Sequence, residues 1–300
     1  MTEPWAPEYP LDADTVLRAV TANTDLSPSE CTKLGEGWDF FCSLLDAHWV
    51  FRFPKRRSEV ERLVAERELL DRLRLSISVP RYAYWIDDPD GFHLPFAGYA
   101  FLPGTPLDRS PIETIDRIGL ARDLGRILED LHAQALTPER AARDPVAPWI
   151  RDWRRDRLSG ALREDLLDLC ERALCAYVSA PPGGKTVTTH NDLGLEHVIM
   201  DTRGRLSAII DWGDAASTDR YVDFAALWAL GGDALLEAAL AHYSHRPSAA
   251  DRTRTRTHGL IYALGQVEYG NKSGDTELAA TATRWLIERA ETGDIEKMIR

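Results

Sequence analysis

The sequence lacks the features that mark a secreted or membrane-bound protein. It has four cysteines but no C-x-x-C pair, which indicates neither a zinc site nor a disulfide framework and favours a reducing compartment. No apolar run approaches the ~20 residues that span a bilayer. The first 14 residues contain three prolines and several acids, whereas a signal peptide has a basic start and an apolar stretch. We therefore expect a cytoplasmic protein without a membrane partner.

Basic residues are also in deficit. The chain has 36 Lys and Arg against 48 Asp and Glu, which gives a net charge of -12 and a pI of about 5.2. Nucleic acids and anionic membranes are bound by clustered Lys and Arg, so neither is expected as a partner. A small-molecule substrate, cationic or neutral, is easier to accommodate, and we expect a monomer or a weak dimer.

Of the 300 residues, 44% are apolar, which is enough to form a substantial core in one or two domains. The N-terminal part alternates between helical and strand-like patterns. Helices are predicted at 11–22 and 58–75, the second with Ser58 as N-cap, and strands within 31–53, 80–87 and 94–102.

A Pro/Gly-containing connector at 101–106 separates this part from one in which helical patterns dominate. Apolar residues lie on one face in 112–133, 162–178 and 221–242. The compact segment 186–212 differs, because two short apolar runs flank a turn-like stretch and predict a hairpin.

Two acids lie at the two ends of this hairpin. Asp192 belongs to the sequence HNDLGLEH, and Asp211 belongs to IDWGD. Phosphoryl transfer requires a carboxylate that orients the attacking hydroxyl and accepts its proton, and another that holds Mg²⁺ on the nucleotide phosphates. The protein-kinase catalytic loop has its Asp two residues after a His, a metal ligand five residues later and an Asp-Gly metal site further on. In this sequence those positions are Asp192, His197 and Asp211.

At these motifs the sequence resembles the aminoglycoside phosphotransferase family, and most closely its 2″-branch. The matching segments, in the same order as in that branch, are LGEGWD at 34–39, VFRFPK at 50–55, FAGY at 96–99 and IIDWGD at 209–214. The resemblance covers residues 34–225. It implies an α+β, protein-kinase-like two-lobe fold. A small antiparallel β-sheet lobe with a helix would occupy residues 1–102, and a larger, mainly helical lobe residues 103–300.

The resemblance implies roles for the loop residues. Asp192 corresponds to the catalytic carboxylate of the family and Asp211 to its principal Mg²⁺ ligand. His197 stands where many relatives have Asn and is expected to be a metal-loop residue, although magnesium prefers oxygen to an imidazole nitrogen. Asp219 and Asp223 match acids that brace this loop, and Asp219 also suits a helix N-cap.

The resemblance also implies a nucleotide site in the small lobe, with ATP or GTP as donor. Arg52 occupies the position where relatives have a Lys that faces the phosphates, Lys55 is an alternative contact, and Glu66 matches the acid that pairs with this cation. The predicted phosphate loop and hinge contain Gly35, Gly37, Tyr99, Ala100 and Leu102.

The expected activity is an NTP- and Mg²⁺-dependent transfer of a phosphoryl group to an antibiotic hydroxyl, and an aminoglycoside is the first candidate. The residues predicted to contact the acceptor are Glu196, Asp214, Glu237 and Glu268. A run of acids that the 2″-branch uses is replaced here by ALGGDA at 229–234, which favours a less cationic acceptor. A macrolide or another sugar-bearing metabolite is therefore an alternative acceptor. A hypothesis of a different class is a nucleotide-binding pseudokinase that regulates a partner.

Overall fold

The computed structural model describes residues 7–36, 39–110, 115–136, 144–179 and 186–299, and the chain forms two compact units. The first unit consists of Met1–Leu73, Ser78–Pro103 and Ile210–Asp214, and the second of Arg74–Ile77, Gly104–Ile209 and Ala215–Arg300. The sequence-based division at 102/103 assigned 210–214 to the larger lobe. In the structure this short segment, which contains Asp211, packs with the first unit.

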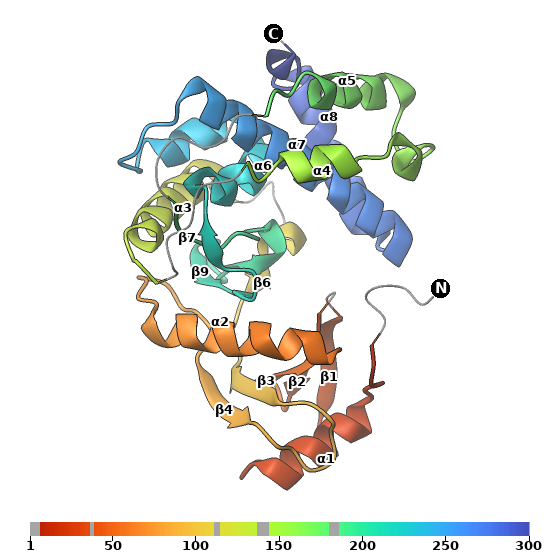
Figure 1. Ribbon diagram of the computed structural model, residues 1–300, viewed down its shortest axis with the longest axis vertical. Coiled ribbons are helices and arrows are strands. Elements are labelled where there is room, and N and C mark those ends of the chain that lie inside the picture. Colours follow the sequence, from red (N-terminus) through yellow and green to blue (C-terminus); the bar gives the residue numbers. More distant parts are fainter. Residues whose placement is uncertain (1–6, 37–38, 111–114, 137–143, 180–185, 300) are drawn as a thin grey trace. The chain divides into compact units, whose positions relative to one another are not determined.

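The first unit is built on an antiparallel sheet of five strands in the order β1-β2-β3-β5-β4 (Figure 1). The strands are β1 (Cys31–Glu36), β2 (Phe40–Leu45), β3 (Trp49–Pro54), β4 (Tyr82–Ile86) and β5 (Phe96–Ala100). Four of them lie within the predicted strand segments, and β3 extends one residue beyond its segment, to Pro54. Their aromatic and β-branched residues fit a pleated surface that is covered on both faces.

Two helices cover the opposite faces of this sheet (Figure 1). Successive side chains of a strand point to opposite faces, so Phe41 packs with the apolar side of α1 (Ala13–Asn23), and Phe40 packs with Leu63 of α2 (Val60–Arg72). The predicted N-cap was wrong. Ser58 lies in a 3-10 turn, η1 (Arg57–Glu59), and its hydroxyl donates to the Glu59 carboxylate.

The second unit contains the predicted hairpin among helices. Strand β8 (Val198–Met200) pairs antiparallel with β9 (Leu206–Ile209) on one side and with β6 (Thr105–Pro106) on the other. A separate two-stranded sheet pairs β7 (Val187–Thr189) with β10 (Ala216–Thr218). The helices are α3 (Arg117–His132), α4 (Ala147–Asp152), α5 (Glu164–Cys175), α6 (Ala225–Leu240), α7 (Ala249–Ser273) and α8 (Thr276–Glu291). Short 3-10 turns are η2 (Leu107–Arg109), η4 (Arg155–Leu158), η5 (Leu195–His197), η6 (Arg220–Phe224) and η7 (Glu296–Met298).

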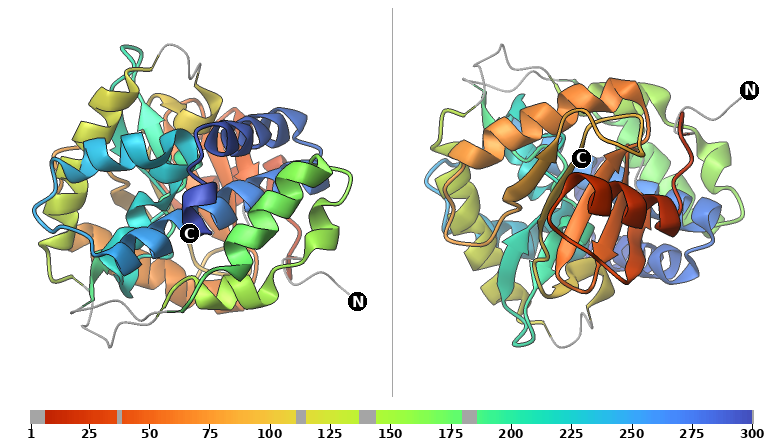
Figure 2. Two further views of the ribbon diagram at one scale, coloured as in Figure 1. Left: turned by 90° about the horizontal axis from the view of Figure 1, so that it is seen from above. Right: turned by 90° about the horizontal axis from the view of Figure 1, so that it is seen from below.

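Helix α7 packs against both α6 and α8 (Figures 1 and 2). The sequence predicted a helical lobe up to residue 300 but no bounds for a helix beyond residue 242, so α7 and α8 were not located individually. The start of α7 has alternating Arg and Thr, and its buried residues include Arg254, Thr255 and Thr257, so polarity does not mark its exposed side. Within the described segments, no helix combines the length and apolarity needed to cross a bilayer.

Candidate active site

The predicted cation and acid of the first unit form a buried ion pair. Strand β3 presents Arg52 opposite Cys42 of β2, and α2 presents Glu66. The Nη1 group of Arg52 donates to both carboxylate oxygens of Glu66 at 2.5 and 2.6 Å, and the Tyr82 hydroxyl donates to Glu66 Oε2 at 3.0 Å. The Arg52 side chain is 4% exposed and that of Glu66 is not exposed at all. The pair therefore has the geometry of the predicted cation and its acid.

Asp211 joins this pair from a distant part of the sequence. The Nη2 group of Arg52 donates to Asp211 Oδ1 at 2.8 Å, and the Trp212 backbone N–H donates to Glu66 Oε1 at 3.2 Å. Asp211 has a φ of 61°, in the left-handed region that Asp and Asn occupy more readily than most residues. Such backbone strain is common at functional sites and is held in place by the surrounding contacts.

The charges of this cluster stabilise one another. Burial alone would lower the pKa of Arg52, but the carboxylates of Glu66 and Asp211 raise it well above its usual range, so the guanidinium stays charged. Burial raises the pKa of Glu66, and Arg52 opposes that shift. The Arg52 guanidinium also lies 4.4 Å from the centroid of the Phe40 ring.

The donor chemistry of Asp211 suits Mg²⁺. Its side chain is 46% exposed and offers a hard carboxylate oxygen, and magnesium sites use one or two protein carboxylates together with nucleotide phosphates. Among the described residues, no three His, Cys, Asp or Glu side chains gather into a metal-binding cluster.

The other predicted nucleotide contacts are spread over the same sheet. Lys55 is 3% exposed, and its ammonium lies 5.0 Å from the centroid of the Phe41 ring, whereas Arg52 forms an ion pair with Glu66. Gly35 pairs with Cys42 at an irregular position of β1, whereas Gly37 lies outside the described residues.

The predicted hinge follows the end of β5. Tyr99 is buried in β5, and its ring packs edge-on against that of Tyr82, with the centroids 5.8 Å apart. Ala100, the last residue of β5, is exposed and pairs with Trp49, and Leu102 is partly exposed. The predicted hinge thus lies at the end of β5, a strand that has β3 on one side and β4 on the other.

In the second unit, Asp192 lies in a loop held by Asp223. The Asp223 carboxylate accepts hydrogen bonds from the backbone N–H groups of His190 at 2.9 Å and Asn191 at 2.8 Å, and from His132 Nε2 at 3.1 Å. Asn191 has a φ of 68°, so a left-handed residue directly precedes Asp192. The Asp192 side chain is 56% exposed. Bracing by Asp223, as expected, thus fixes the backbone while the Asp192 carboxylate stays accessible.

His197 is anchored to the same loop. Its Nδ1 donates to the backbone carbonyl of Asp192 at 2.8 Å and lies 3.9 Å from Asp192 Oδ2, and its ring stacks on the buried ring of His190. In a neutral ring that donates from Nδ1, Nε2 is the nitrogen that carries the lone pair. Asp219 caps η6 by accepting from the Tyr221 N–H and pairs with Arg254 at 3.0 Å, which is a supporting role.

Helix α7 also holds this loop, through contacts that were not predicted from the sequence. The Tyr262 hydroxyl accepts from the Leu195 N–H at 3.0 Å and donates to Glu196 Oε2 at 2.7 Å, and Gln266 donates to Glu196 Oε1 at 3.1 Å. Burial and the nearby Glu196 carboxylate raise the pKa of Tyr262 well above its usual range, so this hydroxyl keeps its proton. A Cβ at Gly194 would overlap the Glu196 carboxylate, so a larger residue there would displace this side chain.

Most acids predicted to contact the acceptor are paired with cations. Arg62 donates to Asp214, Arg252 pairs with Glu237, and Lys272 pairs with Glu268 at 2.6 Å. Glu196 differs, since its hydrogen bonds come from the uncharged Tyr262 and Gln266. Ion pairing reduces the capacity of the other three to bind additional ammonium groups.

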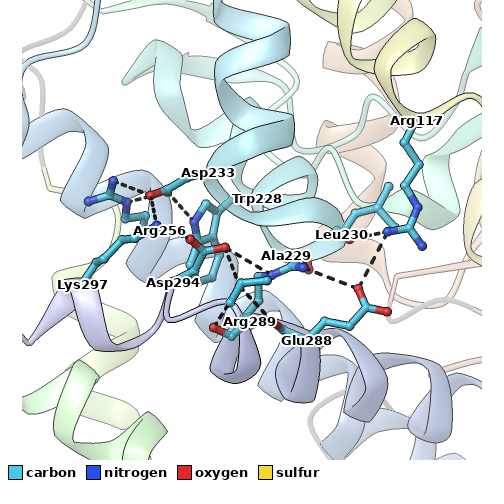
Figure 3. Close-up of polar contacts among 11 residues, drawn as sticks. Arg117, Trp228, Ala229, Leu230, Asp233, Arg256, Glu288, Arg289, Asp294 and Lys297 are labelled. Carbon is cyan, nitrogen blue, oxygen red and sulfur yellow. Dashed lines mark hydrogen bonds and ion pairs between the residues drawn. The ribbon is translucent and has the colours of Figure 1, made fainter.

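Asp233, which lies in the ALGGDA stretch, is likewise neutralised (Figure 3). Arg256 donates two hydrogen bonds of 2.8 Å to its carboxylate, Lys297 donates one of 3.3 Å, and Trp228 Nε1 donates one of 3.1 Å. Burial alone would raise the pKa of Asp233, but the hydrogen bonds from Arg256 lower it below its usual value. This acid therefore ties helices together and adds little negative potential.

Comparison with known proteins agrees with this geometry. A family model described as the phosphotransferase enzyme family matches residues 30–258. Viomycin phosphotransferase from Streptomyces vinaceus is 26% identical over 252 residues, which cover 78% of this chain and 85% of that relative.

Solved structures show the same fold. The GDP and kanamycin complex of APH(2")-IIia has a TM-score of 0.70 at 22% identity, and the match covers 93% of this chain and 98% of the other. The macrolide 2'-phosphotransferase MphH from Brachybacterium faecium has a TM-score of 0.58 at 24% identity, with coverage of 91% and 98%. These similarities confirm the predicted fold class.

Proposed function

Because the chain belongs to the phosphotransferase enzyme family, we propose that it transfers the γ-phosphoryl group of a nucleoside triphosphate to a hydroxyl group of an antibiotic. The observation that carries this proposal is the arrangement around Arg52, in which one guanidinium binds both Glu66 and Asp211. A cation paired with a helical acid and placed beside a metal-binding Asp is the arrangement that protein kinases use on nucleotide phosphates.

Each predicted residue has a role in this proposal. The acceptor oxygen attacks the γ-phosphorus, the proton of the hydroxyl passes to the Asp192 carboxylate, and the bond to the bridging oxygen of the β-phosphate breaks to release the nucleoside diphosphate. Arg52 neutralises phosphate charge, assisted by the backbone at Gly35, the irregular position of β1. Asp211 would hold Mg²⁺, with His197 Nε2 as a weaker candidate ligand, and the bound ion would supply charge neutralisation on the phosphates.

An antibiotic is proposed as acceptor on the basis of the relatives. The names and titles of these proteins refer to viomycin, kanamycin and macrolides, and the nucleotides named are GDP and ADP. We therefore propose ATP or GTP as donor. An aminoglycoside is the first candidate acceptor, and viomycin and a macrolide are the alternatives.

A radiolabelled transfer assay tests this function. Kanamycin, viomycin and a macrolide are offered to the purified chain with Mg²⁺ and either γ-labelled ATP or γ-labelled GTP. We expect label on at least one drug, and Asp192→Asn should lower kcat about 10²- to 10⁴-fold because the proton acceptor is lost. The absence of a labelled drug would argue against an antibiotic kinase, and full turnover by Asp192→Asn would remove Asp192 from the proposed mechanism.

A further inference from the structure

A small pocket lies beside the catalytic loop within the second unit. One side is formed by loop residues 191–194 and the other by α7, with the apolar Val222 and Ala225 between them. Helix α7 contributes His258 and Tyr262, which are four residues apart and therefore lie on one face of the helix. The pocket thus contains Asp192 together with two polar side chains from a separate element.

Of these two side chains, His258 is the one with unused hydrogen-bonding capacity. Its Nδ1 is buried and has no hydrogen-bond partner among the residues that the structure describes. The Tyr262 hydroxyl, by contrast, already accepts from Leu195 and donates to Glu196. Buried polar atoms in native proteins are nearly always hydrogen-bonded, so the Nδ1 atom indicates a partner that is not part of this unit.

His258 is also uncharged at neutral pH. Burial lowers its pKa to about 4, and the nearby Asp223 opposes this shift without cancelling it. A neutral imidazole offers one donor and one acceptor, which suits a hydroxyl or carboxamide group. The acids that would favour a cationic group instead, Glu237 and Glu268, are already paired with Arg252 and Lys272.

We propose that His258 is a specificity-determining residue that hydrogen-bonds an uncharged polar group, a hydroxyl or a carboxamide, of the phosphoryl acceptor in this pocket. The inference rests on the proposed function and deepens it. It assigns to α7 a direct contact with the acceptor, at a position that the sequence motifs did not identify. It also explains how the site selects an acceptor after most of its acids have been neutralised by Arg and Lys.

The test compares His258→Ala with His258→Asn on whichever of kanamycin, viomycin or the macrolide the native chain phosphorylates. The alanine variant should raise the KM for that drug about 5- to 30-fold, the loss expected for one hydrogen bond. Its kcat and its KM for the nucleotide should stay within about twofold. The asparagine variant, which keeps a donor and an acceptor, should recover part of the loss.

His242→Ala is the matched control, because His242 is exposed just beyond the end of α6. It should leave all constants unchanged, and thermal unfolding should verify that each variant is folded. If a folded His258→Ala variant keeps the native KM for the drug, the inference is overturned and the proposed function stands. A histidine that hydrogen-bonds only a water molecule would give this result. If the native chain labels no drug, the proposed function fails and the inference fails with it.

Discussion

Arg52 shows what a single residue contributes to the first unit. Its two terminal nitrogens serve different carboxylates, since Nη1 binds Glu66 and Nη2 binds Asp211. The single ammonium group of a lysine cannot reproduce this fork, so the arginine allows one buried side chain to orient both acids. Because Arg52 is the cation that both acids contact, its removal leaves the buried Glu66 carboxylate without this cation.

We therefore expect Arg52→Ala to lower the free energy of unfolding by about 3–5 kcal/mol and to weaken nucleotide binding. Urea unfolding and titration with a nucleotide measure the two effects. Arg62→Ala is the control, because Arg62 pairs with Asp39 and Asp214 near the surface and its loss should cost at most ~1 kcal/mol. Equal losses in the two variants would contradict the importance assigned to the buried pair.

His258 makes a second prediction at this scale, which concerns pH. The unfolded chain takes up a proton at this residue near the ordinary pKa of 6.5, whereas the folded chain does so only at about 4. Between these values the unfolded state binds more protons, so stability falls as the pH decreases. The contribution is fully present above about pH 6.5, and its loss by pH 4 amounts to about 3 kcal/mol at most.

The free energy of unfolding, measured from pH 7 to pH 4, should therefore fall more steeply for the native chain than for His258→Asn, which has no titrating group at this position. All other titrations are common to both proteins and cancel in the difference. Parallel curves would show that His258 titrates normally in the folded state.

At the scale of elements, α7 holds the loop that contains Asp192. Tyr262 lies on the same face of the helix as His258, and its hydroxyl holds Leu195 and Glu196 through two hydrogen bonds. We expect Tyr262→Phe to lower kcat roughly 10-fold, because a small displacement of Asp192 disturbs the geometry of the transition state. The KM for the nucleotide should change little. Steady-state kinetics test this, and native kcat in the phenylalanine variant would remove Tyr262 from the positioning network.

The kink of α6 is a second feature of an element. Gly231 and Gly232 interrupt the helical backbone, and Gly232 has a φ of 62° and a ψ of -156°, a combination that is essentially restricted to glycine. A Cβ at Gly232 would also overlap the carboxylate of Asp294. We expect Gly232→Ala to destabilise the chain by ~2 kcal/mol or more, measured as a lower midpoint of thermal unfolding.

Gly265→Ala provides the matched comparison. Gly265 lies inside α7, and an added Cβ there would contact nothing within 4 Å. This variant should gain up to ~1 kcal/mol because alanine favours the helix. A loss of stability in both variants would show that the kink conformation is not the reason for the glycine at position 232.

At the scale of the whole molecule, the net charge of -12 does not tell where negative potential is available to a substrate. Asp233, Glu237 and Glu268 have cationic partners, and Glu196 is held by neutral donors. The distribution of ion pairs, and not the total number of acids, decides which charges a ligand encounters. This favours acceptors with fewer ammonium groups over strongly polycationic ones.

The sequence by itself determined the features that depend on short stretches of chain. The alternation of strand residues, the hairpin between Asp192 and Asp211 and the pattern around Arg52 were all readable, because each signal lies within a few residues. The N-cap predicted at Ser58 was wrong because a 3-10 turn precedes α2, and the bounds of α7 and α8 were not predicted because α7 buries polar residues.

Only the tertiary structure decided which of these residues meet. Arg52 reaches Glu66 across 14 residues and Asp211 across 159, and α7 brings Tyr262 to Glu196 across 66. It also decided that most candidate substrate acids are paired with arginine or lysine. Such contacts depend on how the elements pack, and no local periodicity encodes the partner of a side chain that far along the chain.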